Sequence, residues 1–224
     1  MIDGLPFWIS ALFIVTVLAA LILFQAAGRT RIGLLILVVW TALQSWLGLS
    51  GSYQHTTETL PRILLFGVLP PLVFIIALFN TKGGRKAMDA LDLRTLTWLH
   101  TVRVPVEIVL WILVERQLLS PTMSVGGTNF DIFSGLTAPV AATLAFRDDK
   151  VYKPLLLIWN IVCLLLLLNV VITAALAIPS PMQQHSFDQP NAAVLYFPFN
   201  LLPTVVVPLV LLAHLAAIRR LRWM

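Results

Sequence analysis

Residues 154–178 read PLLLIWNIVCLLLLLNVVITAALAI and contain no charged side chain. A helix needs about 20 mostly apolar residues to cross the hydrocarbon core of a bilayer, and this stretch exceeds that length. Six further apolar stretches of similar length lie along the chain: 6–27, 32–50, 61–80, 98–117, 129–147 and 194–218. The pattern predicts an all-α membrane protein, a single domain over residues 1–224 built as one bundle of seven transmembrane helices.

The composition agrees with a lipid environment. Hydrophobic residues make up 59% of the chain and charged residues 11%, with a mean hydropathy of +0.92, whereas soluble domains carry about 25% charged residues. The net charge of +5 is spread over short loops, so no nucleic-acid partner is expected. The single cysteine, Cys163, excludes an internal disulfide and is expected to be a small buried side chain.

The basic residues predict the orientation. Twelve of the fifteen Lys and Arg residues follow the first, third, fifth or seventh stretch. By the positive-inside rule the N-terminus lies outside and the C-terminus in the cytoplasm, and the expected location is the plasma (inner) membrane. The first stretch lacks a basic region before it, so we interpret it as a retained helix rather than a signal peptide.

Two connecting segments stand out. Residues 81–97 place Met88 and Leu91 on one face among charges, which predicts either a short interfacial helix or an N-terminal extension of the fourth span. Residues 179–193 are rich in Pro and Gln and predict a loop.

The fourth span carries ionisable residues where lipid disfavours them. Glu107 falls near its middle, where an ionisable residue costs about 2.5–3.5 kcal/mol on insertion scales. His100 and Arg103 precede it at spacings that place all three on one helical stripe. The stripe predicts either an internal ion pair that ties the bundle together or a site for a proton, an ion or a polar ligand group.

Neutral polar residues in other spans are candidate partners for this stripe. Asn169 lies near the middle of span 6, and Asn200 lies in span 7 beside Thr204. Prolines in spans 3 and 7, including Pro70 and Pro208, each free the carbonyl four residues earlier, which suits a cavity or a static kinked bundle equally well.

At the outer face, the charges at the helix ends allow two interpretations. Glu115, Asp131 and Arg62 could form a polar vestibule leading to Glu107. Alternatively, Asn129 caps span 5 and Asp131 favours its positive end.

The sequence lacks the motifs of several well-known classes of membrane protein and enzyme. The layout resembles that of rhodopsins and receptors, but every lysine lies in a predicted loop, so no Schiff-base lysine is available for retinal. Leu202-Pro203-Thr204-Val205 also departs from the receptor pattern in span 7. No metal-binding spacing, P-loop or serine elbow occurs, so no cofactor or metal is expected.

We therefore expect a protein that binds or translocates a small solute, ion or proton around Glu107, with the lipid bilayer as its surroundings. The alternatives are a membrane-embedded enzyme acting on a lipid, which the missing motifs disfavour, and a non-catalytic scaffold or sensor. The oligomeric state stays open.

Overall fold

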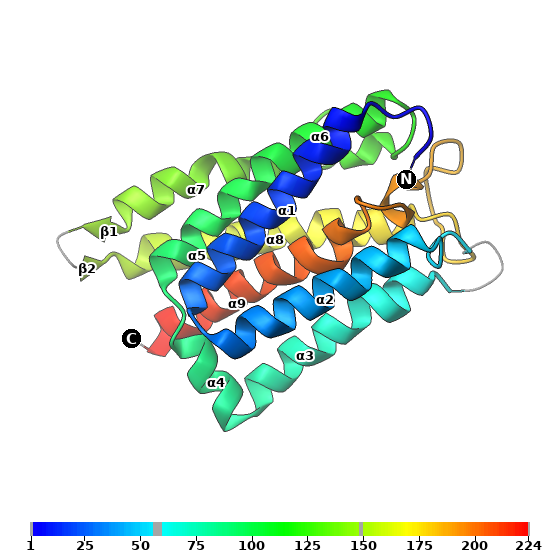
Figure 1. Ribbon diagram of the computed structural model, residues 1–224. Coiled ribbons are helices and arrows are strands. Elements are labelled where there is room, and N and C mark those ends of the chain that lie inside the picture. The colour runs from blue at the N-terminus through cyan, green and yellow to red at the C-terminus, as the bar shows by residue number, and fades with distance from the viewer. Residues whose placement is uncertain (1, 56–59, 148–149, 224) are drawn as a thin grey trace.

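The computed structural model describes residues 2–55, 60–147 and 150–223. The chain forms one bundle of roughly aligned helices, and its two termini lie at opposite ends (Figure 1). The helices are α1 (Phe7–Gly28), α2 (Arg31–Leu49), α3 (Leu69–Asn80), α4 (Lys82–Asp89), α5 (Leu93–Leu99), α6 (Arg103–Glu115), α7 (Ile132–Leu144), α8 (Lys153–Leu176) and α9 (Val207–Trp223). Two π-helical segments, η1 (Ile63–Val68) and η5 (Leu202–Val206), lead into α3 and α9.

Within the described residues, six helical segments are long and apolar enough to cross a membrane: Phe7–Gly28, Arg31–Leu49, Ile63–Asn80, Leu93–Glu115, Lys153–Leu176 and Leu202–Trp223. The architecture is thus consistent with an all-α membrane protein. The remaining predicted span, the fifth (129–147), contains α7, which is apolar but only 13 residues long. The count of seven crossings and the orientation stay predictions.

Both interpretations of residues 81–97 hold in part. Lys82–Asp89 forms the short separate helix α4, and Leu93–Glu115 is one helical segment that extends the fourth span. Asp92 separates the two, because its Oδ1 accepts a hydrogen bond from the Thr95 backbone N–H at 2.8 Å and so caps α5.

The prolines free backbone carbonyls, and side chains of α2 satisfy two of them. Pro70 leaves the Phe66 carbonyl without its helical donor, and Gln44 Nε2 donates to it at 3.2 Å. Pro208 likewise leaves the Thr204 carbonyl without its helical donor, and this carbonyl accepts a hydrogen bond from Trp40 Nε1 at 2.8 Å. At these two kinks the static interpretation is therefore supported, because both carbonyls are paired within the protein.

The predicted start of the last span is wrong by several residues. Regular helix begins near Leu202 rather than at residue 194, and the preceding residues form a short 3-10 turn, Ala193–Leu195, and further turns. Pro198 accounts for part of the delay, because the residue before a proline avoids helical backbone angles, whereas Pro203 lies in the first turn of the helix, where a missing N–H donor is tolerated.

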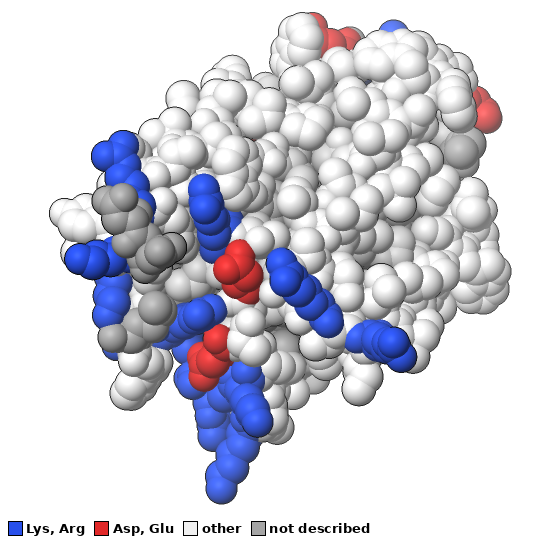
Figure 2. Space-filling model, turned by 60° about the vertical axis from the view of Figure 1, so that its left-hand side comes forward, with Lys and Arg blue, Asp and Glu red and all other residues white. Residues whose placement is uncertain are grey.

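Basic side chains gather at the end of the bundle that holds the C-terminus (Figure 2). Contacts join three chain segments there: Arg219 pairs with Asp89 at 3.1 Å, Arg220 donates to the Leu91 carbonyl, and the Asp92 N–H donates to the Ala27 carbonyl. The two-residue strands β1 (Phe146–Arg147) and β2 (Lys150–Val151) form a small antiparallel hairpin at the same end (Figure 1).

Candidate functional site

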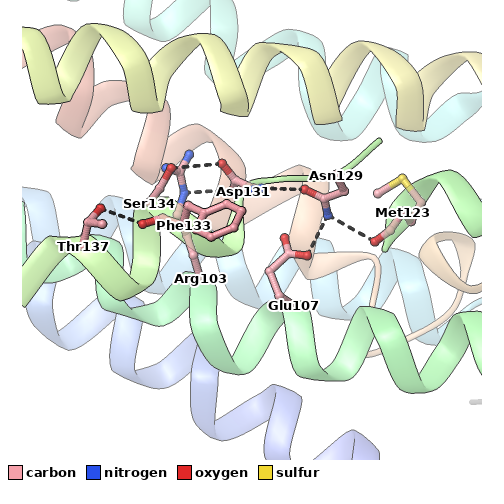
Figure 3. A network of polar contacts seen from close by, with 8 residues as sticks. All are labelled: Arg103, Glu107, Met123, Asn129, Asp131, Phe133, Ser134 and Thr137. Atoms are coloured by element: carbon pink, nitrogen blue, oxygen red, sulfur yellow. Dashed lines mark hydrogen bonds and ion pairs between the residues drawn. The ribbon is translucent and has the colours of Figure 1, made fainter. Parts of the chain in front are cut away.

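Glu107 does not pair with Arg103. It is 5% exposed, and its Oε2 accepts a hydrogen bond at 2.7 Å from Nδ2 of Asn129, which also donates to the Met123 carbonyl (Figure 3). Within the described residues, Glu107 Oε1 has no hydrogen-bond donor and the carboxyl group has no cationic partner. Asn129 therefore fixes one carboxyl oxygen and leaves the other available.

Arg103 pairs instead with Asp131. The distance from Arg103 Nε to Asp131 Oδ2 is 3.0 Å, and both side chains are almost fully buried. The N–H is not aligned for a hydrogen bond, so the contact is an ion pair held mainly by charge. Ser134 donates to the other carboxylate oxygen at 3.5 Å (Figure 3). The predicted ion pair inside the bundle exists, but it uses the carboxylate that the sequence assigned to an outer vestibule.

The local sequence explains why Asn129 and Asp131 serve two different residues. The Asp131 N–H donates to Asn129 Oδ1 at 2.9 Å, which closes a tight turn before α7. Gly135 then lets α7 approach α6, because a Cβ at this position would lie 2.8 Å from Val104 Cγ2. The turn and the glycine together set Asn129 against Glu107 and Asp131 against Arg103.

Glu107 opens onto a groove of about 280 Å³, which we call the Glu107 groove. It is lined by Glu107, Ile108, Trp111, Val125, Gly126 and Ile132. Trp111 is 56% exposed and Ile108 44% exposed, so the groove lies on the outside of the bundle rather than along its axis. Its lining combines one carboxyl group with apolar and aromatic side chains.

His100 belongs to a neighbouring cluster. Its ring stacks on that of His214 with centroids 3.9 Å apart, and Trp159 packs against both rings. Asn160 donates through Nδ2 to the Leu156 carbonyl, so its Oδ1 accepts from His214 Nδ1 at 2.9 Å. This assigns the proton of His214 to Nδ1 and leaves Nε2 as a buried acceptor without a partner among the described residues.

Asn169 and Asn200, which were predicted to contact the charged stripe, form their hydrogen bonds with other residues. Asn169 is exposed on α8 and donates to the Thr128 carbonyl at 2.9 Å, so it holds the segment that precedes Asn129. Asn200 donates to the Gln44 carbonyl at 2.8 Å and packs against Gly48 on α2. Neither interpretation as a neutral partner of Glu107 fits these contacts.

The predicted outer vestibule is not assembled. Glu115 and Arg62 are exposed at helix ends and take part in neither of the ion pairs found in the described ranges, whereas Asp131 is buried beside Arg103. Asp131 lies at the N-terminal end of α7 and pairs with Arg103 of α6, so it is buried against α6 rather than exposed beside Glu115 and Arg62.

Sequence reasoning underrated Asn129 and missed the contact of His214 with Asn160. The signal for Asn129 was its place two residues before Asp131 at the start of a span, which suits capping equally well. No group of three or more His, Cys, Asp or Glu residues that could hold a metal ion occurs in the part of the chain that was searched.

Residues 60–222 match the model of a family described as a domain of unknown function (DUF8737), and the chain therefore belongs to that family. The match includes every residue of the site, whereas α1 and α2 precede it. A search of curated proteins found no match, and neither did a search of solved structures.

Proposed function

We propose that this member of the DUF8737 family is a membrane protein that binds a small solute or ion through Glu107. The observation that supports this most directly is that four side chains form two separate pairs, Arg103 with Asp131 and Glu107 with Asn129. Asp131 neutralises Arg103 at 3.0 Å, and Asn129 holds Glu107 Oε2 at 2.7 Å. Glu107 lines the groove, and its Oε1 is unpaired within the described residues.

Physical chemistry argues for a bound cationic or hydrogen-bond-donating group at this oxygen. A buried carboxylate without a counter-charge is costly, so it takes up a proton or a cation. Acids within membrane helices mark binding sites or proton pathways more often than they serve packing. Arg103 does not fill this role, because its charge is balanced by Asp131.

The short helix α7 supports a location within the bilayer. Its 13 residues rise about 20 Å, less than the hydrocarbon thickness of about 30 Å. In the proposed seven-crossing arrangement, with the N-terminus outside, the segment before α7 therefore enters the outer half of the membrane. Irregular backbone at such a depth is tolerated where it is buried in protein or lines a cavity, and Asn129 belongs to this segment.

The remaining parts of the proposal concern direction and location. The basic end of the bundle would face the cytoplasm of a cell whose plasma membrane holds the protein. Binding is the minimal function, and translocation would require Glu107 to be reached from the second side as well. The His100–His214 cluster lies on the cytoplasmic side of Arg103 in this orientation. On a path from Glu107 to the cytoplasm, it would provide the next polar side chains.

The proposal is tested by thermal unfolding of the purified protein, followed by tryptophan fluorescence, with a panel of inorganic cations, guanidines, and amines with and without an alkyl chain. We expect at least one cationic compound to raise the unfolding temperature of the wild type and not that of Glu107→Gln. The matched control is Glu115→Gln, which removes an exposed carboxylate from the end of the same helix. If no compound distinguishes Glu107→Gln from the wild type, the proposal is wrong.

A further inference from the structure

The walls of the Glu107 groove determine from which side a ligand reaches it. Trp111, Ile108 and Val125 are 56%, 44% and 43% exposed, and all three are large and apolar. Phe130 and Phe133, on either side of Asp131, are also strongly exposed. Side chains of this kind on the outside of a membrane bundle face lipid, so the groove opens sideways toward acyl chains rather than toward water.

The charge of the groove determines the ligand's head group. Glu107 is the only ionisable residue in the lining, and no Lys or Arg contributes to it. Trp111 follows Glu107 by one helical turn on the same face, so its ring can contact a cation held by the carboxylate. The groove therefore favours a positive head group and offers nothing to balance a phosphate carried next to it.

The size of the groove determines how much of the ligand it encloses. Its volume of about 280 Å³ falls just below the usual range for small-molecule pockets, about 300–1,000 Å³. A compact head group fits this space, and any longer tail would lie outside it, along Ile108 and Trp111.

We propose that the Glu107 groove binds single-chain amphiphilic amines that reach it from the lipid phase, with the ammonium group against Glu107 Oε1 and the alkyl chain in the bilayer. This inference rests on the proposed function and names its ligand class. It distinguishes such amines from aminophospholipids, whose phosphate lies next to the amine, and from short amines that lack a tail.

The test uses the protein in phosphatidylcholine nanodiscs and a dodecylamine analogue with a photoreactive diazirine in its chain. After illumination, peptide mapping should place the adduct on the segments that line the groove, around Ile108, Trp111 and Val125. Excess dodecylamine should compete, whereas ethylamine and dodecanoate at equal concentration should not. The Glu107→Gln variant should lose about tenfold or more of the adduct, because a charge-assisted hydrogen bond is lost.

Gly126 offers a second variant that keeps Glu107. A Cβ at Gly126 would meet only Ser124 Oγ, at 3.7 Å, so the backbone has room for a side chain at this lining position, and Gly126→Leu is expected to fill part of the groove. It should lower the yield of the adduct as Glu107→Gln does. The matched control is Gly83→Leu on α4, where a Cβ meets nothing within 4 Å and which lies outside the groove.

Two results would overturn the inference. One is an adduct spread over other exposed helices, such as α3 and α8, with equal yield in Glu107→Gln, which is the pattern of simple partitioning into lipid. The other is competition by ethylamine as strong as that by dodecylamine, which would place the opening in water. In the second case small amines would still protect the wild type against unfolding, so the proposed function would survive.

Discussion

Arg103 and Glu107 lie one helical turn apart, yet each contacts a different residue at the start of α7. Arg103 forms an ion pair with Asp131, and Glu107 accepts a hydrogen bond from Asn129. The two buried acids therefore differ in role: one balances a charge within the protein, and the other retains a free oxygen at a groove.

This difference predicts that replacing Asp131 lowers the stability of the protein much more than replacing Glu107 does. Asp131→Asn leaves the buried Arg103 without a counter-charge and should lower the free energy of unfolding by about 3–5 kcal/mol. Glu107→Gln keeps an acceptor for Asn129 and should change it by less than about 1 kcal/mol. Tryptophan fluorescence during titration with a denaturing detergent measures both.

A double variant provides the control for that contrast. Replacing Arg103 by Met together with Asp131 by Leu removes both charges and should recover most of the loss seen in Asp131→Asn. Equal destabilisation by Glu107→Gln and Asp131→Asn would mean that Glu107, too, is a structural residue.

At this scale the sequence predicted the charged stripe but not its partners. The positions of His100, Arg103 and Glu107 follow from helical spacing alone, and the structure buries all three. The partners of Arg103 and Glu107 depend on how the turn at residues 129–131 packs against α6, which is a tertiary feature without periodicity. Asn169 and Asn200 were chosen by depth, and depth does not fix the face of a helix or its neighbour.

Among the elements, α2 is the one that stabilises the two kinked segments. It brings Gln44 to the carbonyl freed by Pro70 and Trp40 to that freed by Pro208. Tyr53, in the turn after α2, donates its hydroxyl hydrogen to Gln44 Oε1 at 2.5 Å. Burial raises the pKa of Tyr53 to about 12, so this hydroxyl remains a donor across the physiological range.

Trp40→Phe tests the capping of the kink in the last span. The change leaves the Thr204 carbonyl buried without its side-chain donor and should cost about 1–3 kcal/mol of unfolding free energy. Trp46→Phe on the same helix is the control, because Trp46 is exposed. Equal effects of the two changes, measured by circular dichroism during detergent denaturation, would refute a special role for Trp40.

Two glycines allow the same elements to approach each other. A Cβ at Gly67 would lie 2.3 Å from Thr204 Cγ2, and one at Gly48 would lie 2.5 Å from Asn200 Oδ1. Gly67→Ala and Gly48→Ala should each destabilise the protein by about 1–3 kcal/mol through overpacking. Gly83→Ala, where the added Cβ meets no neighbour, should be neutral or slightly stabilising in the same unfolding measurement.

The predictability of the elements follows from their regularity. The starts and ends of α1, α2 and α8 agree with the apolar stretches to within two residues, because hydropathy and helix coincide there. Hydropathy did not predict the start of the last span, where Pro198 precedes the helix, or the length of α7, which is shorter than its apolar stretch. Both failures arise where backbone chemistry, rather than hydropathy, determines where the helix begins.

For the whole molecule, the distribution of charge predicts the orientation in the membrane. The basic end of the bundle in Figure 2 joins the loop after α1, helix α4 and the end of α9. Such an end favours the cytoplasmic side and contact with anionic lipid head groups.

Cysteine labelling of intact cells tests this orientation. In a Cys163→Ala background, a cysteine at Gln117 should react with an impermeant maleimide, and one at Lys150 should react only after permeabilisation. Both positions are exposed, and Cys163 is a buried free thiol, so the background change removes no accessible group. The reverse labelling pattern would invert the proposed orientation and place the segment before α7 in the inner half of the bilayer.

Glu107 is proposed to be a binding group rather than a buried structural acid. Native mass spectrometry of gently extracted protein, comparing the wild type with Glu107→Gln, tests this most directly. We predict a discrete bound mass on the wild type that is absent from Glu107→Gln, while Asp131→Asn retains it in whatever fraction stays folded. The same bound species on the wild type and on Glu107→Gln, in equal amount, would contradict the account.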